Sequence, residues 1–202
     1  WLPYAIVVNA QSKLNSYADL RAAALADPGK LTYASIGNGT TSHLIVLLLQ
    51  QRTGLKLTHV PYRGSAQAQT DLIGGQVNMF TADFAVMLPQ VNAGKVRGLA
   101  VTSTKRSRAI PELPTVNEAL GVKDYELIAY FAMYTPAGTP AEVIAKLNKA
   151  INNAANSKDL QEKLSSFGLV IDPGSPDDLA KRNQAESIKW AKAIHDAKIE
   201  PQ

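Results

Sequence analysis

The residues best suited to chemistry lie in the segment from Tyr33 to His43, where two glycines precede two threonines. A short apolar stretch ends here, the glycines permit positive φ, and a hydroxyl-rich helix begins. Free N–H groups at a helix N-terminus, its dipole and nearby hydroxyls together favour an anion. The candidate ligand-binding residues of this segment are Ser35, Gly37, Asn38, Gly39, Thr40 and Thr41. The alternative is an ordinary strand-to-helix turn with a threonine cap. A nucleotide phosphate is not expected, because no P-loop lysine follows.

Two more expected strand ends carry polar side chains. In the segment from His59 to Ser65, Tyr62 could point its ring or hydroxyl into a cleft, and Arg63 could pair with a carboxylate. After the next apolar stretch, Asp83 could accept a hydrogen bond from a ligand amine or hydroxyl, or hold a neighbouring loop. The alternatives are a Tyr62 ring packed on its own loop, a solvated Arg63 and an Asp83 that only caps the next helix.

Catalysis and metal binding find little support in the sequence. Ser42 and His43 are adjacent on an expected helix and point in different directions, so they do not form a base-activated pair. The three histidines, His43, His59 and His195, lie far apart, and the chain has no cysteine. We therefore expect no catalytic residue, no metal site and no cofactor.

Composition limits the other classes of function. The chain has 202 residues, of which 46% are hydrophobic and 19% charged, which suits one large domain or two small lobes with a buried core. The net charge of +4 is spread along the chain, with Lys105–Arg108 as the only short basic cluster. This charge does not indicate a nucleic-acid partner and is compatible with an anionic ligand. The most apolar run, Leu44–Leu49, is far shorter than a membrane span of about 20 residues.

The elements that must position these residues alternate between strand and helix. Strands are expected at Tyr4–Val8, Leu31–Ile36, Lys56–Val60, Val77–Thr81, Val96–Thr102 and Ile128–Tyr134. Helices are expected from Ser16 to Pro28, from Thr40 to Gly54, from Ser65 to Leu72 and from Asp83 to Asn92. This alternation predicts βαβ units and a largely parallel sheet, at whose carboxyl edge the three polar segments would meet.

The last third of the chain is predicted to be helical. The Pro/Gly segment Thr135–Thr139 is a candidate hinge or boundary. Thr139 and Glu142 then have the spacing of a capping box with proline at the first helical position. Further helices are expected to begin at Ser157 and Ser175, and the last would run to about Ala197.

Several segments, in this order, resemble the motifs of one protein family. Tyr33–His43, YASIGNGTTSH, resembles the YxSxGxGTxSHL segment of that family, and His59–Ser65, HVPYRGS, resembles its HVPYKGS segment. Residues 72–80, 88–103, 111–119 and 136–140 match other motifs. The family is the Bug/TctC type of extracytoplasmic solute receptor, which serves tripartite tricarboxylate transporters. The resemblance covers essentially the whole chain.

The resemblance implies a periplasmic binding protein whose two α/β lobes close on a small carboxylate. The segment 35–41 would form an anion loop, and Tyr62 and Asp83 would line the same cleft. The implied fold is a periplasmic-binding-protein type II-like lobe, with a mixed, mostly parallel sheet flanked by helices. Residues 9–127 would form this second, ligand-binding lobe. Residues 1–8 and 128–202 would be the remaining, mostly helical part of a truncated first lobe.

The chain departs from the family pattern in two places. Family members often carry Asp-Asn where this chain has Ala82 and Asp83. The opening portion of the family, with its signal peptide and a Gly/Pro-rich ligand loop, has no counterpart here. The apolar faces of the helices after Pro140 would then need cover, from a second copy in a homodimer or from a complementing N-terminal segment.

The expected function is a periplasmic receptor, not an enzyme, that captures a small carboxylate and delivers it to the membrane subunits of a tripartite tricarboxylate transporter. The ligand could be a dicarboxylate, a tricarboxylate, an amino acid or an aromatic acid. One alternative is a sensor or effector-binding module that presents a carboxylate to a regulatory partner. Others are an α/β enzyme acting on an acyl or phosphate substrate, and a truncated fragment that lacks binding.

Overall fold

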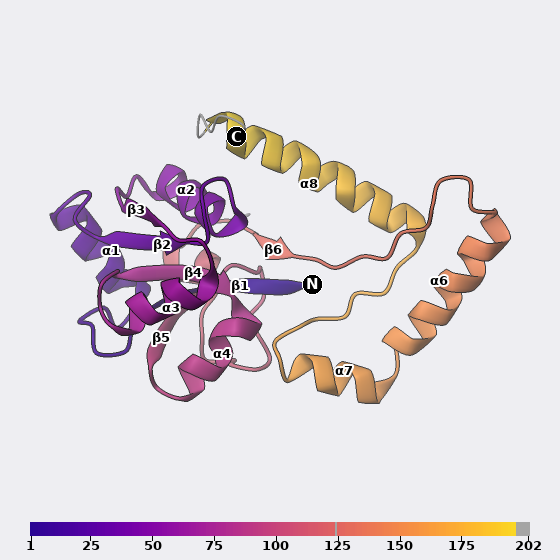
Figure 1. Cartoon of the computed structure of the whole chain (residues 1–202), viewed down its shortest axis with the longest axis horizontal. Coiled ribbons are helices and arrows are strands. Elements are labelled where there is room, and N and C mark those ends of the chain that lie inside the picture. Colours follow the sequence, from indigo (N-terminus) through magenta and orange to yellow (C-terminus); the bar gives the residue numbers. More distant parts are fainter. Residues whose placement is uncertain (124, 197–202) are drawn as a thin grey trace.

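A mixed β-sheet forms the centre of the computed structural model, which describes residues 1–123 and 125–196 (Figure 1). In spatial order its strands are β3 (Thr58–Pro61), β2 (Thr32–Ser35), β4 (Met79–Asp83), β1 (Leu2–Asn9) and β5 (Val96–Val101), and β6 (Ile128–Ala129) pairs with the start of β1. β2 is parallel to β3 and β4, whereas β1 is antiparallel to β4, β5 and β6. Every described strand except β1 therefore runs in one direction, which confirms the expected mixed, mostly parallel sheet.

Strand β1 lies in the interior of this sheet. Its side chains alternate between two apolar clusters: Ile6 and Val8 pack on one face, and Ala5 and Val7 on the other. All four are fully buried, which explains why this strand is a continuous apolar run.

The expected division of the chain placed residues 1–8 outside the lobe formed by residues 9–127. In the structure, Tyr4–Val8 pair with Met79–Asp83, so these residues belong to the sheet of that lobe. The physical reason is that β1 carries apolar side chains on both faces. Such a strand is buried on both faces inside the sheet, where helices pack on each side.

Helices cover both faces of the sheet (Figure 1). The cluster containing Ile6 is covered by α1 (Tyr17–Ala26), α2 (Thr41–Thr53) and α5 (Val116–Leu120), and the cluster containing Ala5 by α3 (Ser65–Ile73) and α4 (Phe84–Asn92). The helix α4 continues through Pro89 to Asn92.

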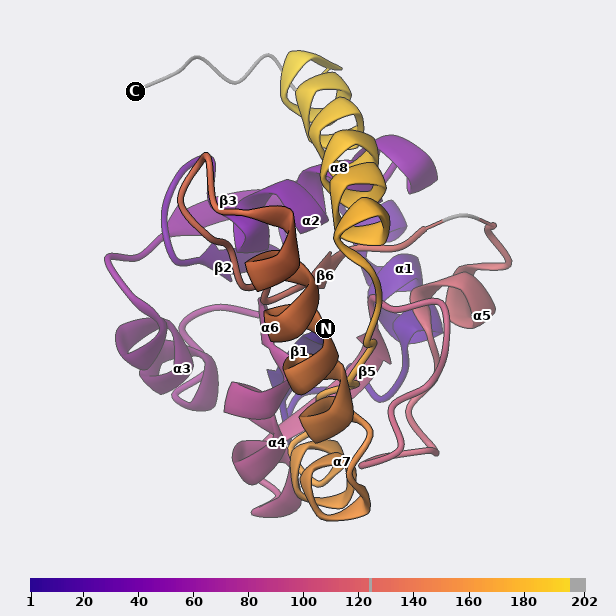
Figure 2. The ribbon, with the colours of Figure 1, turned by 90° about the vertical axis from the view of Figure 1, so that its right-hand side faces the viewer.

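The rest of the chain forms an extended C-terminal part with α6 (Ala141–Ala155), α7 (Lys158–Ser165) and α8 (Pro176–Asp196). Figures 1 and 2 show α6 and α7 standing away from the sheet, while α8 returns toward α2. Trp190 of α8 packs against the apolar cluster beneath α2. The backbones of Trp1 and Val170 exchange two hydrogen bonds, of 2.6 and 2.8 Å.

The expected strand at Ile128–Tyr134 is wrong beyond Ala129. Only Ile128 and Ala129 pair with the sheet, opposite Pro3 and Leu2. The backbone of Trp1, which precedes β1, is hydrogen-bonded to Val170 instead. Phe131, Met133 and Tyr134 are instead 69–76% exposed.

A glycine fixes the junction between α7 and the sheet. Gly168 has φ of +76°, and a Cβ built on it would lie 2.4 Å from Cδ1 of Phe84. Phe84 begins α4 and is fully buried. Only a residue without a side chain allows the chain to pass this ring so closely.

Candidate functional site

A cavity of about 120 Å³ lies where β2, β3 and β4 end and α2, α3 and α4 begin. Its lining comes from the three strand-to-helix connections and from the start of β1: Tyr4, Ile36, Ser42, Ser65, Thr81, Ala82, Asp83 and Val86. The carboxyl edge of a parallel sheet is the place where α/β proteins usually bind ligands. The three polar segments singled out in the sequence therefore meet at one edge.

The three helices that begin at this edge have open N-termini. None of α2, α3 and α4 has a side-chain cap hydrogen bond or an acidic residue in its first turn. In contrast, capping boxes close α1 and α5, formed by Ser16 with Asp19 and by Thr115 with Glu118. Open helix ends present unpaired N–H groups and positive dipole ends, so this edge favours an anion.

Hydroxyl groups fix the loop between β2 and α2. Thr40 Oγ1 donates to the Gly37 carbonyl at 2.6 Å and lies 3.0 Å from Ser42 Oγ. Ser42 Oγ in turn accepts from the Ile36 N–H at 3.0 Å. These hydroxyls bind the loop, so they do not cap α2, and the N–H groups of Thr41 and Ser42 have no acceptor among the described residues.

Histidine rings pack beneath the same loop. His43 and His59 stack with ring centroids 4.0 Å apart, and Tyr33 stacks on His59 at 4.9 Å. Nδ1 of His43 accepts from the Gly39 N–H at 3.1 Å, and Nε2 of His59 lies 2.6 Å from Oγ of Ser35. Burial lowers the pKa of His43, and burial together with His43 lowers the pKa of His59 to about 4. Both imidazoles are therefore neutral at pH 7 and hold the loop in place.

The contact between Ser35 and His59 does not form a nucleophile and base. Ser35 is fully buried, and its hydroxyl also bonds both the N–H and the carbonyl of Gly37. Ser42 and His43, the adjacent pair in the sequence, bond other groups and not each other in the described structure. Both serines therefore act in holding the loop.

Tyr4 and Asp83 form the opposite wall of the cavity, at facing positions of β1 and β4. Burial raises the pKa of Tyr4, the Asp83 carboxylate raises it further, and a hydrogen bond with Thr41 lowers it. Burial raises the pKa of Asp83, and a hydrogen bond from Tyr4 opposes this rise. The Tyr4 hydroxyl thus lies near both Thr41, at the start of α2, and the Asp83 carboxyl group.

The structure separates some predicted residues from the cavity. Asp83 lines it, and Thr41 lies beside the Tyr4 hydroxyl. Residues 35–40 form the loop next to it. Tyr62 does not line the cavity, and its hydroxyl donates to Oδ2 of Asp71 at 2.8 Å. A ligand role for each of these residues stays a prediction.

Sequence reasoning missed four polar residues of the wall: Tyr4, Ser42, Ser65 and Thr81. Ser65 directly follows Gly64, and Ser42 follows the two threonines after Gly39. Both stand within the polar segments already singled out, and this position was the available signal. Thr81 lies on β4, two residues before Asp83, and Tyr4 reaches this edge through the pairing of β1 with β4.

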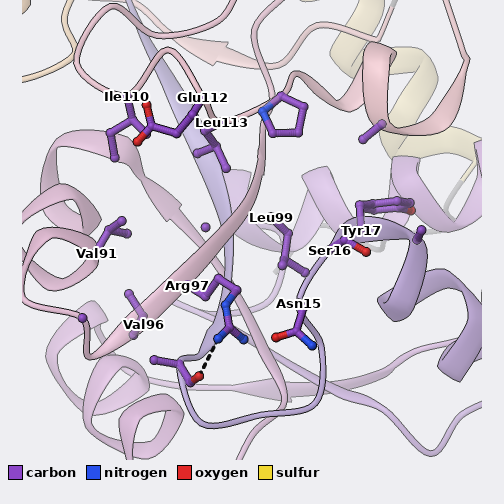
Figure 3. A pocket seen from close by; sticks show the side chains of 16 residues that line it. Asn15, Ser16, Tyr17, Val91, Val96, Arg97, Leu99, Ile110, Glu112 and Leu113 are labelled. Carbon is purple, nitrogen blue, oxygen red and sulfur yellow. Dashed lines mark hydrogen bonds between the residues drawn. The ribbon is translucent and has the colours of Figure 1, made fainter.

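A larger cavity, of about 790 Å³, lies elsewhere, between β5, the start of α1 and the segment 110–114 (Figure 3). Arg97 enters it, but its guanidinium donates to the carbonyls of Ala10 at 2.9 Å and Leu14 at 3.2 Å. None of the predicted ligand residues lines this cavity. Its one cation is thus bound by backbone carbonyls, so the smaller cavity at the sheet edge is the better candidate.

Solved structures with the same fold are periplasmic binding proteins, and this is the class that the fold defines. The chain aligns with R. palustris Rpa4515, solved with adipate, at a TM-score of 0.87 and 35% identity, covering 100% of this chain and 67% of that one. It aligns with the periplasmic binding protein BugD at a TM-score of 0.80 and 30% identity, covering 100% and 68%. The malate-bound MatC of Rhodopseudomonas palustris gives a TM-score of 0.78 at 26% identity, covering 96% and 66%.

The family follows from the sequence as a whole. Residues 2–199 match the model of the tripartite tricarboxylate transporter family receptor, TctC, and the chain belongs to this family. It is 39% identical over 193 residues to the UPF0065 protein of the tcbD-tcbE intergenic region of Pseudomonas sp. strain P51, covering 96% of this chain and 57% of that protein. It is 33% identical to BugT of Bordetella pertussis, covering 96% and 60%.

The chain thus spans a little over half the length of these curated relatives. The resemblance to the Bug/TctC receptors is confirmed, and the family is one of solute-binding receptors. Within residues 1–123 and 125–196, no helix has the length and apolar character needed to cross a membrane.

Proposed function

We propose that this chain is part of a periplasmic receptor that captures a small carboxylate and delivers it to the membrane subunits of a tripartite tricarboxylate transporter. The observation that carries the proposal is the convergence of three open helix N-termini on one cavity. The adipate and malate in the related structures support a carboxylate as the ligand.

The geometry suits a protein that binds its ligand and does not transform it. The carboxylate oxygens would accept hydrogen bonds from the free N–H groups of Thr41 and Ser42, with the dipole of α2 adding to the attraction. Closure of a second lobe over the cavity would exclude water and strengthen these hydrogen bonds. Such a receptor needs fixed donors more than titrating groups.

The C-terminal part carries apolar surface that a complete receptor would cover. Val143, Leu147 and Ile151 follow one another at helical spacing along α6 and are 40–44% exposed. We expect a complementing N-terminal segment or a second copy of the chain to cover this face. Native mass spectrometry of the purified protein would distinguish a dimer, a co-purifying segment and a bare monomer, and release of a small acid on denaturation would name the ligand class.

Replacing both Thr40 and Thr41 by alanine should weaken carboxylate binding about 10-fold or more, because each lost hydrogen bond contributes about 0.5–1.5 kcal/mol. Thr40 donates to the Gly37 carbonyl, and Thr41 lies beside the Tyr4 hydroxyl at the cavity wall. Titration calorimetry with malate and with adipate measures the effect. Thr139→Ala is the matched control, since that hydroxyl bonds only the Pro136 carbonyl in the C-terminal part. Unchanged affinity in the double variant would exclude a role for these threonines.

A further inference from the structure

Two groups in the wall of the cavity at the sheet edge are not explained by anion binding alone. Asp83 brings a carboxyl group into a cavity that is otherwise built to attract an anion. Thr81, on the same strand, is fully buried, and its Oγ1 has no hydrogen-bond partner among the described residues. A buried hydroxyl without a partner is unusual in a folded protein and points to a partner supplied from outside.

The Asp83 carboxylate restricts which acids can enter. Asp83 lines the same cavity as Ser42 of the first turn of α2, so a carboxylate held at the start of α2 lies near a second negative charge. Two carboxylates that share a poorly hydrated space repel each other. An ammonium or hydroxyl group on the ligand, next to its carboxylate, would lie between them and donate to Asp83.

The size of the cavity agrees with one end of a small ligand. A volume of about 120 Å³ corresponds to roughly four water molecules at about 30 Å³ each. This is room for a carboxylate, the adjacent carbon and one polar substituent. The Thr81 hydroxyl could then donate to a ligand oxygen or accept from the same substituent.

We propose, on the basis of the function proposed above, that this site selects acids carrying a hydrogen-bond donor, an ammonium or a hydroxyl, beside the bound carboxylate. Asp83 is the specificity-determining residue, because it accepts from that donor. Thr81 completes the contact through its hydroxyl, which has no partner within residues 1–123 and 125–196.

Titration calorimetry on the purified 202-residue chain tests this with acids that differ in the donor. Succinate and adipate have none, malate has a hydroxyl and aspartate an ammonium. We expect malate or aspartate to bind at least about 10-fold more tightly than succinate, the range of a hydrogen bond to a charged group. Asp83→Asn should abolish most of that difference. Asp27→Asn, an exposed aspartate at the end of α1, is the control.

The outcomes separate this inference from the proposed function. Equal affinity for succinate, malate and aspartate would overturn the selection by Asp83 and leave carboxylate capture standing. Tighter succinate binding at lower pH would also overturn it. Asp83 would then take up a proton and tolerate a nearby carboxylate, so no donor on the ligand would be needed. Failure of all four acids to bind would overturn the proposed function itself.

A second variant, Thr81→Val, keeps the shape of the side chain and removes its hydroxyl. We expect affinity for the preferred acid to fall about 2- to 10-fold, the loss of one hydrogen bond. The midpoint of urea unfolding without ligand should rise or stay unchanged, because the hydroxyl has no partner in the described part of the chain. Unchanged affinity would remove Thr81 from the site, and a large loss of stability would show that its hydroxyl has a structural role.

Discussion

Gly168→Ala is expected to lower the free energy of unfolding by about 2–5 kcal/mol, the largest effect on stability foreseen for a single methyl group in this chain. The left-handed backbone at Gly168 would cost about 1–2 kcal/mol with a side chain. The new Cβ would also overlap Cδ1 of Phe84, whose ring is fully buried. Overpacking of this kind costs about 1–3 kcal/mol.

The matched control is Gly138→Ala. Gly138 has a similar φ of +82°, but no atom lies within 4 Å of its built Cβ, so only the backbone cost of about 1–2 kcal/mol applies. Urea unfolding followed by circular dichroism gives both values. Trp1 is a fluorescent probe of the junction between α7 and the sheet, because its backbone bonds Val170. Replacing Trp190 by phenylalanine leaves Trp1 as the single tryptophan to be followed. Equal losses in the two variants would mean that the Phe84 ring yields to the methyl group.

Lowering the pH from 7 to 4.5 is expected to destabilise the fold and weaken carboxylate binding together. An unfolded histidine has a pKa near 6.5, whereas the folded pKa of His59 is about 4 and that of His43 is also lowered. Between these values the unfolded chain binds protons that the folded chain does not, so acid favours unfolding. The histidine contribution is therefore complete above about pH 6.5 and is lost as the pH falls toward 4.

Carboxylate affinity should fall together with the free energy of unfolding, because the same two histidine rings hold the anion loop in place. A proton on Nδ1 of His43 would remove the acceptor of the Gly39 N–H, and two stacked cations would repel each other. Urea titrations and calorimetry with malate at a series of pH values measure both effects. His59→Gln should flatten the dependence of unfolding free energy on pH between 6.5 and 4. An unaltered slope in this variant would contradict the assignment to His59.

The sequence predicts most elements well where local signals are strong. Ser16 and Asp19 form a capping box at the expected start of α1, and Gly54, where the next helix was expected to end, is the left-handed C-cap of α2. The helix α5 was missed, although Thr115 and Glu118 carry the same capping signature. The box expected at Thr139 does not form, because its hydroxyl donates to the Pro136 carbonyl and the helix begins at Ala141.

The candidate site was predictable only in part. Some of its residues belong to local sequence patterns, and others reach the site only through the tertiary structure. Glycines and hydroxyls locate the loop between β2 and α2, and Asp83 follows its strand in sequence, so local patterns find them. Tyr4 depends on which strands pair, and Tyr62 turns to Asp71 in α3. No local pattern shows that β1 is antiparallel and lies beside β4. Pairing across such sequence distances is decided by burial on both faces, which a periodicity does not reveal.

The position of β1 also sets the order in which the lobe can fold. This strand is the first part of the described chain to be synthesised, yet Val8 pairs with Met79 and Ala5 with Val101. The parallel strands β2, β3 and β4 can assemble earlier, but the edge of β4 stays open until β1 arrives. Such long-range pairing slows folding. While the edge is open, it can accept the first strand of another molecule, so β1 is the element that two copies of this chain would exchange at high concentration.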